Sequence, residues 1–266
     1  EKPDVGTFMR EWLSLYDSKS GERGIYSSMS AQRHTEKLNT QRKNEDGTYI
    51  QRRVAKEDFG TNPCSEIILR SREFCNLSEV VIRREDTSES LKEKVRIATI
   101  LGTFQSTLTE YKYLSREWKR NCDEERLLGV SLTGIMDNPL TNGSKKGLDK
   151  LLEELRDIAY ETNKEWADKL GIPVSAAITC VKPSGTVSQL VDSASGIHAR
   201  HNPYYIRTVR ADNKDPLCKM MKKEGFPNEV DVTKPEHTTV FSFPFKTPKG
   251  AVCRMDMSAL EQLELW

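Results

Sequence analysis

The sequence Ala176-Ala-Ile-Thr-Cys-Val181 runs without a break into Lys182-Pro-Ser-Gly-Thr186. A short apolar segment that ends in a turn of this kind predicts a strand followed by a loop. On its N-terminal side, an amphipathic helical pattern extends from Leu148 to Leu170, and Gly171 predicts its end. Leu127-Leu-Gly-Val-Ser-Leu-Thr-Gly-Ile135 predicts an earlier strand and a small-residue turn. This alternation predicts an α/β fold with largely parallel strands.

Other segments continue the same alternation on both sides. Asp86-Thr-Ser-Glu89 resembles a capping box, and the helical pattern that it opens carries apolar residues from Leu91 to Leu108. The remaining elements expected are helices over residues 5–17, 215–224 and 257–266, and strands over residues 67–69, 80–82, 204–209 and 238–243.

Composition and charge exclude several classes of protein. Lys+Arg 41 against Asp+Glu 40 gives a net charge of +1, which argues against a general nucleic-acid binder. No apolar run approaches the roughly 20 residues of a membrane helix, and the first residues lack a signal-peptide pattern. The 6 cysteines form no CxxC pair, which indicates free thiols. We therefore expect a cytoplasmic protein that binds neither nucleic acid nor membrane.

The two ends and one internal segment bear on domain organisation. Helical patterns run into both ends of the sequence without a stop signal. We therefore expect residues 1–266 to be a segment of a longer chain, incomplete at both ends. Residues 30–57 are rich in Gln, Arg, Lys, Asn and Glu and hold few apolar side chains, which predicts a polar loop or an insertion.

The densest group of reactive side chains lies in Asp58-Phe-Gly-Thr-Asn-Pro-Cys-Ser-Glu-Ile67. Gly60 and Pro63 predict a loop before a strand there. If residues 62–66 are extended, Asn62, Cys64 and Glu66 project from one side, because a strand alternates faces. A thiol can act as a nucleophile or, once oxidised by one electron, can abstract a hydrogen atom. A carboxylate can take the proton of a hydroxyl that an amide orients. The alternative is a loop cysteine capped by local polar groups.

A second thiol follows eleven residues later, where Cys75 lies in Glu73-Phe-Cys-Asn-Leu-Ser-Glu79. The chain turns between two predicted strands there, so Cys75 could return beside Cys64. Two thiols near a carboxylate indicate redox chemistry in which one delivers electrons as the other acts. A buried small residue without a chemical role is the alternative for Cys75.

Lys182-Pro-Ser-Gly-Thr-Val-Ser188 predicts a phosphate-binding loop, because its glycine and hydroxyl residues can offer N–H and O–H groups. It is not a Walker motif, since GK[ST] is absent. His198 and His201 lie three residues apart, but no Cys or His cluster of standard spacing accompanies them, so we expect no metal site. Either histidine could instead serve Cys64 in a cysteine hydrolase.

Taken together, these stretches resemble the catalytic subunit of ribonucleotide reductases, in particular the adenosylcobalamin-dependent class II enzymes. The stretches are Asn62-Pro-Cys-Ser-Glu66, Phe74-Cys-Asn-Leu-Ser-Glu79, Pro183-Ser-Gly-Thr-Val-Ser-Gln-Leu190 and Ser195-Gly-Ile-His198. The resemblance implies part of a ten-stranded α/β barrel with a catalytic finger loop. It implies radical reduction of ribonucleotides, with triphosphates favoured, to 2′-deoxyribonucleotides for DNA synthesis. It also implies adenosylcobalamin as cofactor and a thioredoxin-like or other dithiol reductant as partner.

The resemblance also implies a role for individual residues. Cys64 matches the cysteine whose thiyl radical removes the ribose 3′ hydrogen, and Glu66 matches the carboxylate that takes the 3′-hydroxyl proton. Asn62 matches an amide that hydrogen-bonds the substrate hydroxyls, and Cys75 matches one of two cysteines that reduce the intermediate and end as a disulfide. The residues that match the loop around the substrate phosphates are Ser184, Gly185, Thr186 and Ser188.

Two departures from the family keep other interpretations open. The family places the second reducing cysteine on an early barrel strand, but residues 1–63 contain no Cys, so the partner of Cys75 lies elsewhere. The family's C-terminal cysteine pair is also absent. The rest of the barrel would come from a longer chain or a second polypeptide. A class I large subunit with a separate radical subunit, and a non-catalytic remnant that binds a nucleotide or a partner, are the alternatives. The cysteines interpreted as structural are Cys122, Cys180, Cys218 and Cys253.

Overall fold

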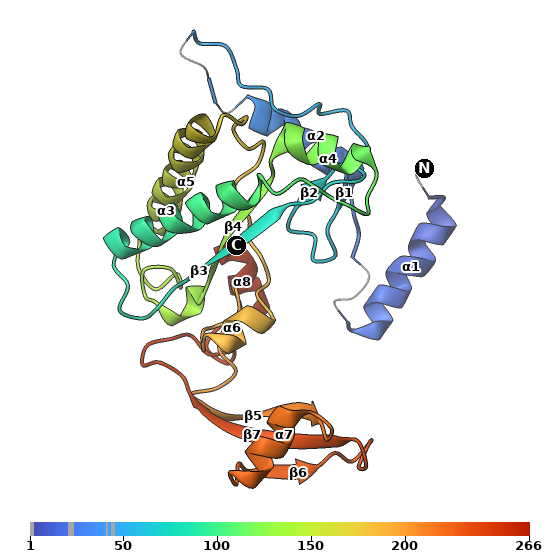
Figure 1. The fold of residues 1–266 in the computed structure, drawn as a ribbon, viewed down its shortest axis with the longest axis vertical. Helices are drawn as coiled ribbons and strands as arrows, with labels where there is room; N and C mark the ends of the chain where they lie inside the picture. Colours follow the sequence, from blue (N-terminus) through green and yellow to red (C-terminus); the bar gives the residue numbers. More distant parts are fainter. Residues whose placement is uncertain (1–2, 21–23, 41, 44–45) are drawn as a thin grey trace. The chain divides into compact units, whose positions relative to one another are not determined.

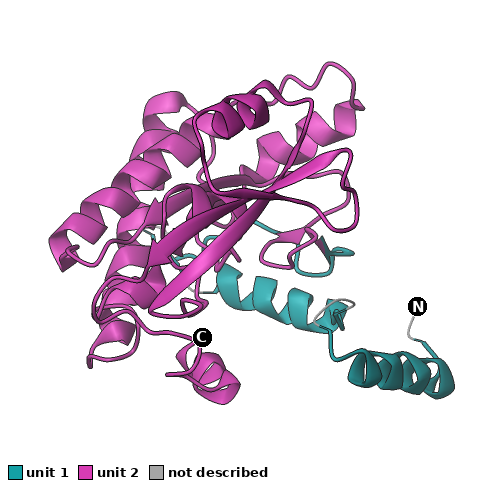
Figure 2. Ribbon diagram, turned by 90° about the horizontal axis from the view of Figure 1, so that it is seen from below, with its two compact units in different colours: residues 1–60 teal, residues 61–266 magenta. Residues whose placement is uncertain are grey.

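The computed structural model describes residues 3–20, 24–40, 42–43 and 46–266. The chain divides into two units, residues 1–60 and residues 61–266 (Figures 1 and 2). The first unit contains α1 (Val5–Ser18) and α2 (Ser28–Asn39), and β1 (Gly60–Thr61) lies at the boundary. The helices of the second unit are α3 (Ser88–Gln105), α4 (Arg116–Glu125), the 3-10 helix η1 (Ile135–Asp137), α5 (Leu148–Leu170), α6 (Thr186–Leu190), α7 (Pro216–Lys223) and α8 (Ala259–Leu265). Its strands are β2 (Ile68–Leu69), β3 (Asn76–Val81), β4 (Leu128–Thr133), β5 (Tyr204–Asp212), β6 (Asn228–Val230) and β7 (Thr238–Lys246).

A parallel ladder between β3 and β4 organises the second unit. It runs from the pair Asn76 and Leu128 to the pair Val81 and Thr133. The chain that follows α5 extends this sheet, because the Leu128 N–H donates to the Ala177 carbonyl over 2.9 Å and Thr179 forms a parallel bridge with Val130. The predicted strand at residues 176–181 therefore lies beside β4, although its regular pairing is limited to this bridge.

The two faces of this sheet differ in chemistry. α3 and α5 pack against each other, and α3 also packs against β3 and β4 (Figure 1). The buried core between them is apolar, as its members show: Val80, Ile82, Leu91, Val95, Ala98, Leu128, Val130, Leu151, Leu155, Ala159 and Ile178. Successive side chains of a strand alternate between faces. The opposite face therefore carries the side chains of Leu77 and Glu79, and Gly129 lies there without a side chain. That second face carries the polar groups of the candidate site.

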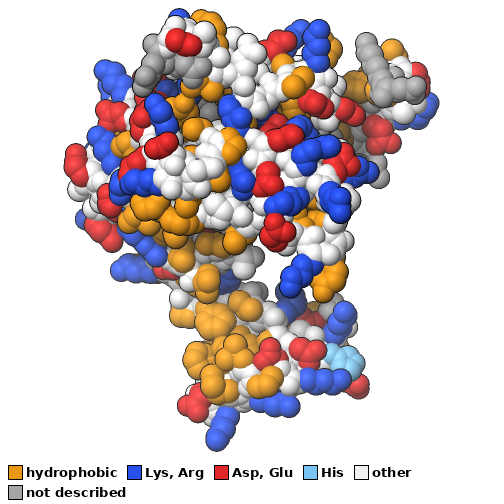
Figure 3. Space-filling view, turned by 45° about the horizontal axis from the view of Figure 1, so that its top comes forward, with side chains coloured by type: hydrophobic (Ala, Val, Ile, Leu, Met, Phe, Trp, Pro, Cys, Tyr) orange, Lys and Arg blue, Asp and Glu red, His pale blue; other side chains and the backbone are white. Residues whose placement is uncertain are grey.

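A separate lobe of the second unit corrects the expectation of largely parallel strands. β5, β7 and β6 form an antiparallel sheet in that order, with Tyr204 paired to Lys246 and Asn228 to Phe241 (Figure 1). Antiparallel strands can be joined by short connections without a crossover helix. The alternation of helices and strands along the sequence therefore does not predict whether neighbouring strands run parallel or antiparallel. Hydrophobic side chains gather on the surface of this lobe (Figure 3), and Ile206 is 69% exposed.

Two sequence expectations about helix starts need correction. Residues 30–57 are not all loop, because α2 extends to Asn39. The Ser27 side chain caps its start, accepting the Ser30 N–H at 3.2 Å, and no long apolar stripe marks the helix in the sequence. α3 is capped by Thr87 with Ser90, not by Asp86. In the described part of the chain, none of the helices combines the length and the apolar character that crossing a membrane requires.

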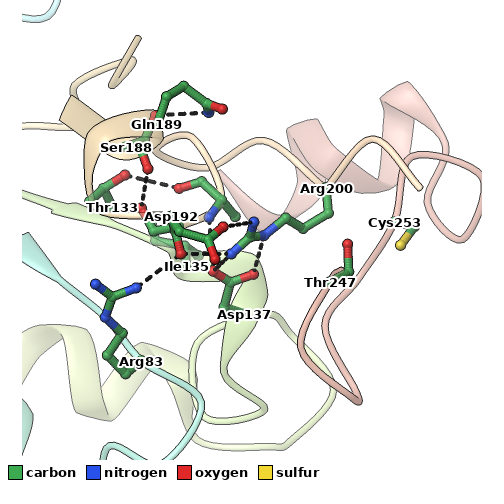
Figure 4. A network of polar contacts seen from close by, with 12 residues as sticks. Arg83, Thr133, Ile135, Asp137, Ser188, Gln189, Asp192, Arg200, Thr247 and Cys253 are labelled. Carbon is green, nitrogen blue, oxygen red and sulfur yellow. Dashed lines mark hydrogen bonds and ion pairs between the residues drawn. The ribbon is translucent and has the colours of Figure 1, made fainter. Parts of the chain in front are cut away.

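An ion-pair network around the buried Arg200 side chain ties together the segments that follow β4 and α6. The Arg200 guanidinium contacts Asp137 through Nε and Nη2, both at 2.9 Å, and Asp192 through Nη1 at 2.8 Å (Figure 4). The side chains of Arg200 and Asp137 are each only 3% exposed. Asp137 also accepts the Ala194 N–H, and Arg83 donates to the Asp192 carbonyl. The network therefore fixes the turn after α6 to the end of β4.

We predict that Arg200→Met lowers the free energy of unfolding by about 3 kcal/mol or more, because it leaves the Asp137 carboxylate buried without its cation. Urea denaturation of the purified protein measures this loss. Arg156→Met is the matched control, since its pair with Asp157 is 48% and 64% exposed and should contribute little. Equal stability of the two variants would contradict the prediction.

Candidate active site

The segment that carries Asn62, Cys64 and Glu66 is a turn, as Gly60 and Pro63 predict, and not the extended chain that would place the three side chains on one side. The Ser65 N–H donates to the Asn62 carbonyl at 2.9 Å, and Ser65 has a φ of 63°. The Asn62 side-chain oxygen accepts the Ile67 N–H at 3.0 Å, so this amide closes the turn. The turn leaves Cys64 exposed and sends the Glu66 side chain inward, where it is only 1% exposed.

Glu66 meets a cation from a distant part of the chain. The Lys182 ammonium lies 2.9 Å from Glu66 Oε1, although the two residues are 116 positions apart. The other carboxylate oxygen, Oε2, is buried and has no hydrogen-bond partner among the described residues. Burial alone would raise the pKa of Glu66, but the hydrogen bonds from Lys182 and Asn62 outweigh it and hold the pKa below its ordinary value. Glu66 is therefore an ionised carboxylate with one free acceptor oxygen.

The thiol of Cys75 has the opposite electrostatic environment. Burial and then the negative charge of Glu66 raise the pKa of Cys75 to about 11. The same causes raise the pKa of Cys180 to about 12, with Cys75 contributing after Glu66. Both thiols therefore keep their protons at neutral pH. Cys180, interpreted as structural from the sequence, lies in the electrostatic field of the site.

Cys75 and Cys180 are not joined by a disulfide, although Cys75 lies close enough to contribute to the raised pKa of Cys180. Both thiols are free in the structure.

Glycine at position 129 lets the turn approach the sheet. A Cβ atom there would lie 2.4 Å from Leu77 Cδ2, 3.2 Å from Ile67 Cδ1 and 3.2 Å from Cys180 Sγ. The Ile67 side chain, next to Glu66, therefore packs directly on the face of the sheet that carries Gly129 and Leu77. This close approach places the carboxylate beside the two half-buried thiols.

The predicted phosphate loop uses two of its hydroxyls internally. Ser184 Oγ donates to Glu79 Oε2 at 2.9 Å and accepts the Ser188 N–H at 3.1 Å. Ser188 Oγ donates to the Ser184 carbonyl at 2.8 Å, and both residues are at most 2% exposed. Gly185 and Thr186 are the exposed members of the set. The serines therefore shape the loop, and the exposed pair is left to face a ligand.

The segment around Gly196 supports this loop from behind. Gly196 has a φ of +54°, and a Cβ atom there would lie 2.7 Å from the Lys182 carbonyl and 3.3 Å from the Ser184 nitrogen. Its N–H donates to Thr133 Oγ1 at 3.0 Å, which fixes it to the end of β4. A larger residue would push the loop away from the site.

The histidines are engaged elsewhere. His198 Nδ1 lies 3.0 Å from the Ser195 carbonyl of its own turn, and the His201 ring packs edge-on against Tyr205. Cys64 lies close enough to Lys182 to raise the pKa of that lysine. Neither of the two histidine contacts involves Cys64, so they give no support to a cysteine hydrolase. Among the described residues, no group of three or more His, Cys, Asp or Glu side chains is placed to hold a metal ion.

Two residues of the site were missed by sequence reasoning. The sequence marks Lys182 only as part of a loop motif and Glu79 only as the last residue of the stretch around Cys75. Their contacts join positions 116 and 105 residues apart, so no local pattern could reveal them. The one available signal was the spacing of Lys182 and Ser184, which places both side chains on the same side of an extended segment.

Comparisons with known proteins agree with the resemblance in the motifs. No family model matches the chain. The chain is 31% identical over 213 residues to an adenosylcobalamin-dependent ribonucleoside-triphosphate reductase of Lactobacillus delbrueckii subsp. bulgaricus, a match that covers 70% of this chain and 28% of the relative. It is 30% identical over 207 residues to the enzyme of the same description from Euglena gracilis, covering 78% and 28%.

The fold gives the same result. A crystal structure of a B12-dependent class II ribonucleotide reductase matches with a TM-score of 0.63 and 26% identity, over 77% of this chain and 32% of that chain. The chain is a homologue of part of these reductases. It spans less than a third of the length of the curated relatives that it matches. The described part is mixed α/β, like the corresponding part of the reductase fold.

We predict that iodoacetamide alkylates Cys75 about 10²-fold more slowly than a free thiol at pH 8, because a pKa of about 11 lowers its thiolate fraction that far. The rate should rise as the pH approaches 11. Peptide mass spectrometry after timed alkylation measures each cysteine separately. Exposed Cys64 should react faster, and Cys218, which is 1% exposed, should react only after unfolding. Rapid labelling of Cys75 at pH 8 would contradict the prediction.

Proposed function

We propose that this chain supplies catalytic residues for the radical reduction of ribonucleoside triphosphates to 2′-deoxyribonucleotides, as part of a ribonucleotide reductase barrel with a catalytic finger loop. The observation that carries the proposal is the Glu66 carboxylate. It is ionised, buried and left with one unpartnered oxygen, close to the exposed thiol of Cys64 and the protonated thiol of Cys75. A ribose hydroxyl is a donor of the kind that this oxygen lacks.

The proposed first step divides the work between two residues of the turn. A thiyl radical at Cys64 takes the hydrogen atom from ribose C3′. Glu66 Oε2 accepts the proton of the 3′-hydroxyl, which makes loss of the 2′-hydroxyl easier. Asn62 holds the turn closed and hydrogen-bonds Glu66, so it orients the carboxylate that receives the substrate hydroxyl.

The proposed reduction uses two thiols. Cys75 keeps its proton at neutral pH, and that proton is available to the leaving 2′-hydroxyl, which departs as water. Cys75 and a second thiol give up two hydrogen atoms in total and end as a disulfide, while Cys64 returns its hydrogen atom to C3′. A dithiol reductant of the thioredoxin type would then restore the pair. The second thiol would belong to the rest of the barrel, in a longer chain or a second polypeptide.

The loop of residues 182–188 would hold the substrate phosphates. Gly185 and Thr186 are exposed and can offer backbone N–H groups and a hydroxyl. Ser184 and Ser188 keep the loop in shape through their buried hydrogen bonds. The bond between Lys182 and Glu66 joins this loop to the turn at residues 62–66, here called the catalytic turn. It would set the distance between the site that holds the ribose and the site that holds the phosphates.

The relatives support a cofactor for this chain, and its cysteines support a location. Relatives of this chain carry the description adenosylcobalamin-dependent, and this cofactor supplies an organic radical when it is bound. The exposed thiol of Cys64 fits contact with it, and we assign no residue of this chain to hold the corrin. We infer a cytoplasmic enzyme, since all six cysteines are free.

We predict that Glu66→Gln slows nucleotide reduction by about 10²-fold or more in the complete enzyme, because the amide cannot accept the 3′-hydroxyl proton. Turnover of ribonucleoside triphosphates with added adenosylcobalamin and dithiol measures this loss. Glu165→Gln is the control, since Glu165 pairs with Lys169 on an exposed helix surface.

Three outcomes separate the alternatives. Full activity of Glu66→Gln would contradict the role of this base. A requirement for a metal-containing second protein in place of adenosylcobalamin would assign the chain to a class I type enzyme. Nucleotide binding that Cys64→Ala leaves unchanged, with no reduction in any reconstituted complex, would identify a non-catalytic remnant.

A further inference from the structure

The pairing of Lys182 with Glu66 has a geometry that goes beyond charge neutralisation. The ammonium lies 2.9 Å from Oε1, and the lysine side chain is 26% exposed while the carboxylate is 1% exposed. The bond occupies one oxygen and leaves the other, Oε2, buried without a partner. A carboxylate with two free oxygens could rotate, whereas this one is held in a single orientation.

Lys182 also belongs to the segment that leads into the predicted phosphate loop. Two residues later, Ser184 donates to Glu79 Oε2 at 2.9 Å, and Glu79 Oε1 is likewise buried and unpartnered. The segment from Lys182 to Ser184 is thus tied to the catalytic turn through Glu66 and to β3 through Glu79. These two ties set the distance between Glu66 and the exposed residues Gly185 and Thr186.

We propose that Lys182 is a positioning residue for the reaction: its ammonium keeps Glu66 ionised, orients Oε2 toward the substrate hydroxyl and couples the base to the loop that holds the phosphates. This inference rests on the proposed function of Glu66 as the base. Lys182 itself need not touch the substrate, because its bond is made to the carboxylate.

The other charged and titratable groups around this pair do not replace the lysine. Cys64 and Cys180 lie close enough to Lys182 to raise its pKa further, after the larger effect of Glu66. Cys75 lies near Glu66, and Glu79 near Cys180. The protonated thiols carry no positive charge, and the second carboxylate disfavours the ionised form of Glu66. Without the ammonium, burial would be opposed by the hydrogen bonds from Asn62 and the Glu66 backbone, and the pKa of Glu66 would rise.

The test is the pH dependence of kcat in the complete enzyme. Lys182→Met should move the acidic limb of the profile upward by one pH unit or more, since a paired opposite charge shifts a carboxyl pKa by about 1–3 units. The variant should lose more kcat at pH 5 than at pH 8, where the Glu66 carboxyl is ionised again. KM should change less than kcat, and Lys182→Arg, which keeps the charge, should restore most of the activity.

A matched control removes a similar pair away from the site. Lys94 lies 2.6 Å from Asp86, whose side chain is 7% exposed, so Lys94→Met also deprives a buried carboxylate of its lysine. This variant should leave the pH profile of kcat unchanged. An unshifted profile in Lys182→Met would overturn the proposal. A large rise in KM with kcat unchanged would also overturn it, because Lys182 would then bind the phosphates directly.

A second measurement does not depend on turnover. The carboxyl carbon of Glu66, followed by NMR in selectively 13C-labelled enzyme, should titrate at higher pH in Lys182→Met than in the unsubstituted enzyme and in Lys94→Met. An unchanged midpoint would overturn the coupling. If Glu66→Gln proves fully active while the midpoint still moves, the proposed role of Glu66 as base fails and the electrostatic coupling stands.

Discussion

The parallel pairing of β3 with β4 separates an apolar face from a polar face, and the rest of the second unit depends on that separation. On one side, α3 and α5 bury Val80, Leu128 and Val130 in a continuous core. On the other, Glu79 points away from the core and meets the loop that follows the extended segment at residues 177–180. Parallel strands carry their connecting loops past the same edge, so the loops after residues 81, 133 and 181 meet there.

A second constraint acts on those loops from behind the site. Arg200 and Asp137 form a buried ion pair, which the exposed Asp192 joins, and these contacts anchor the chain after α6 to η1 (Figure 4). Buried ion pairs of this kind contribute less to net stability than their contacts suggest, but they penalise alternative arrangements strongly. Gly196 lies between this network and Lys182, where only a glycine fits against the Lys182 carbonyl. Close packing against Gly196 and the bonds from Lys182 to Glu66 and from Ser184 to Glu79 therefore determine the position of the loop.

Elements with a strong local signal could be predicted from the sequence. The helix that ends at Gly171 and the strand at Leu128–Thr133 carry their own periodicity and breakers, and both are confirmed. α2 could not be predicted, because its stability comes from a cap and a few buried contacts rather than from an apolar stripe. The loop at residues 62–66 could be predicted from Gly60 and Pro63, but its conformation could not, because Asn62 closes the turn through the Ile67 N–H and this contact leaves no pattern in the sequence. The Lys182–Glu66 pair joins segments 116 residues apart, and only the folded sheet brings them together.

The protonation states of Glu66 and Cys75 depend on how close these groups lie to each other and to Lys182. Glu66 and Cys75 experience the same low-dielectric surroundings, and burial raises the pKa of both. Lys182 reverses the effect for the carboxylate alone, because it is bonded to that group at 2.9 Å. The ionised carboxylate then raises the pKa of the thiol further. One lysine therefore separates the two groups into a base and a proton donor at the same pH, a division that enzymes use to run acid and base chemistry side by side. A neutral residue at position 182 would raise the pKa of Glu66 and so narrow the pH range in which its carboxylate can accept a proton from a ribose hydroxyl.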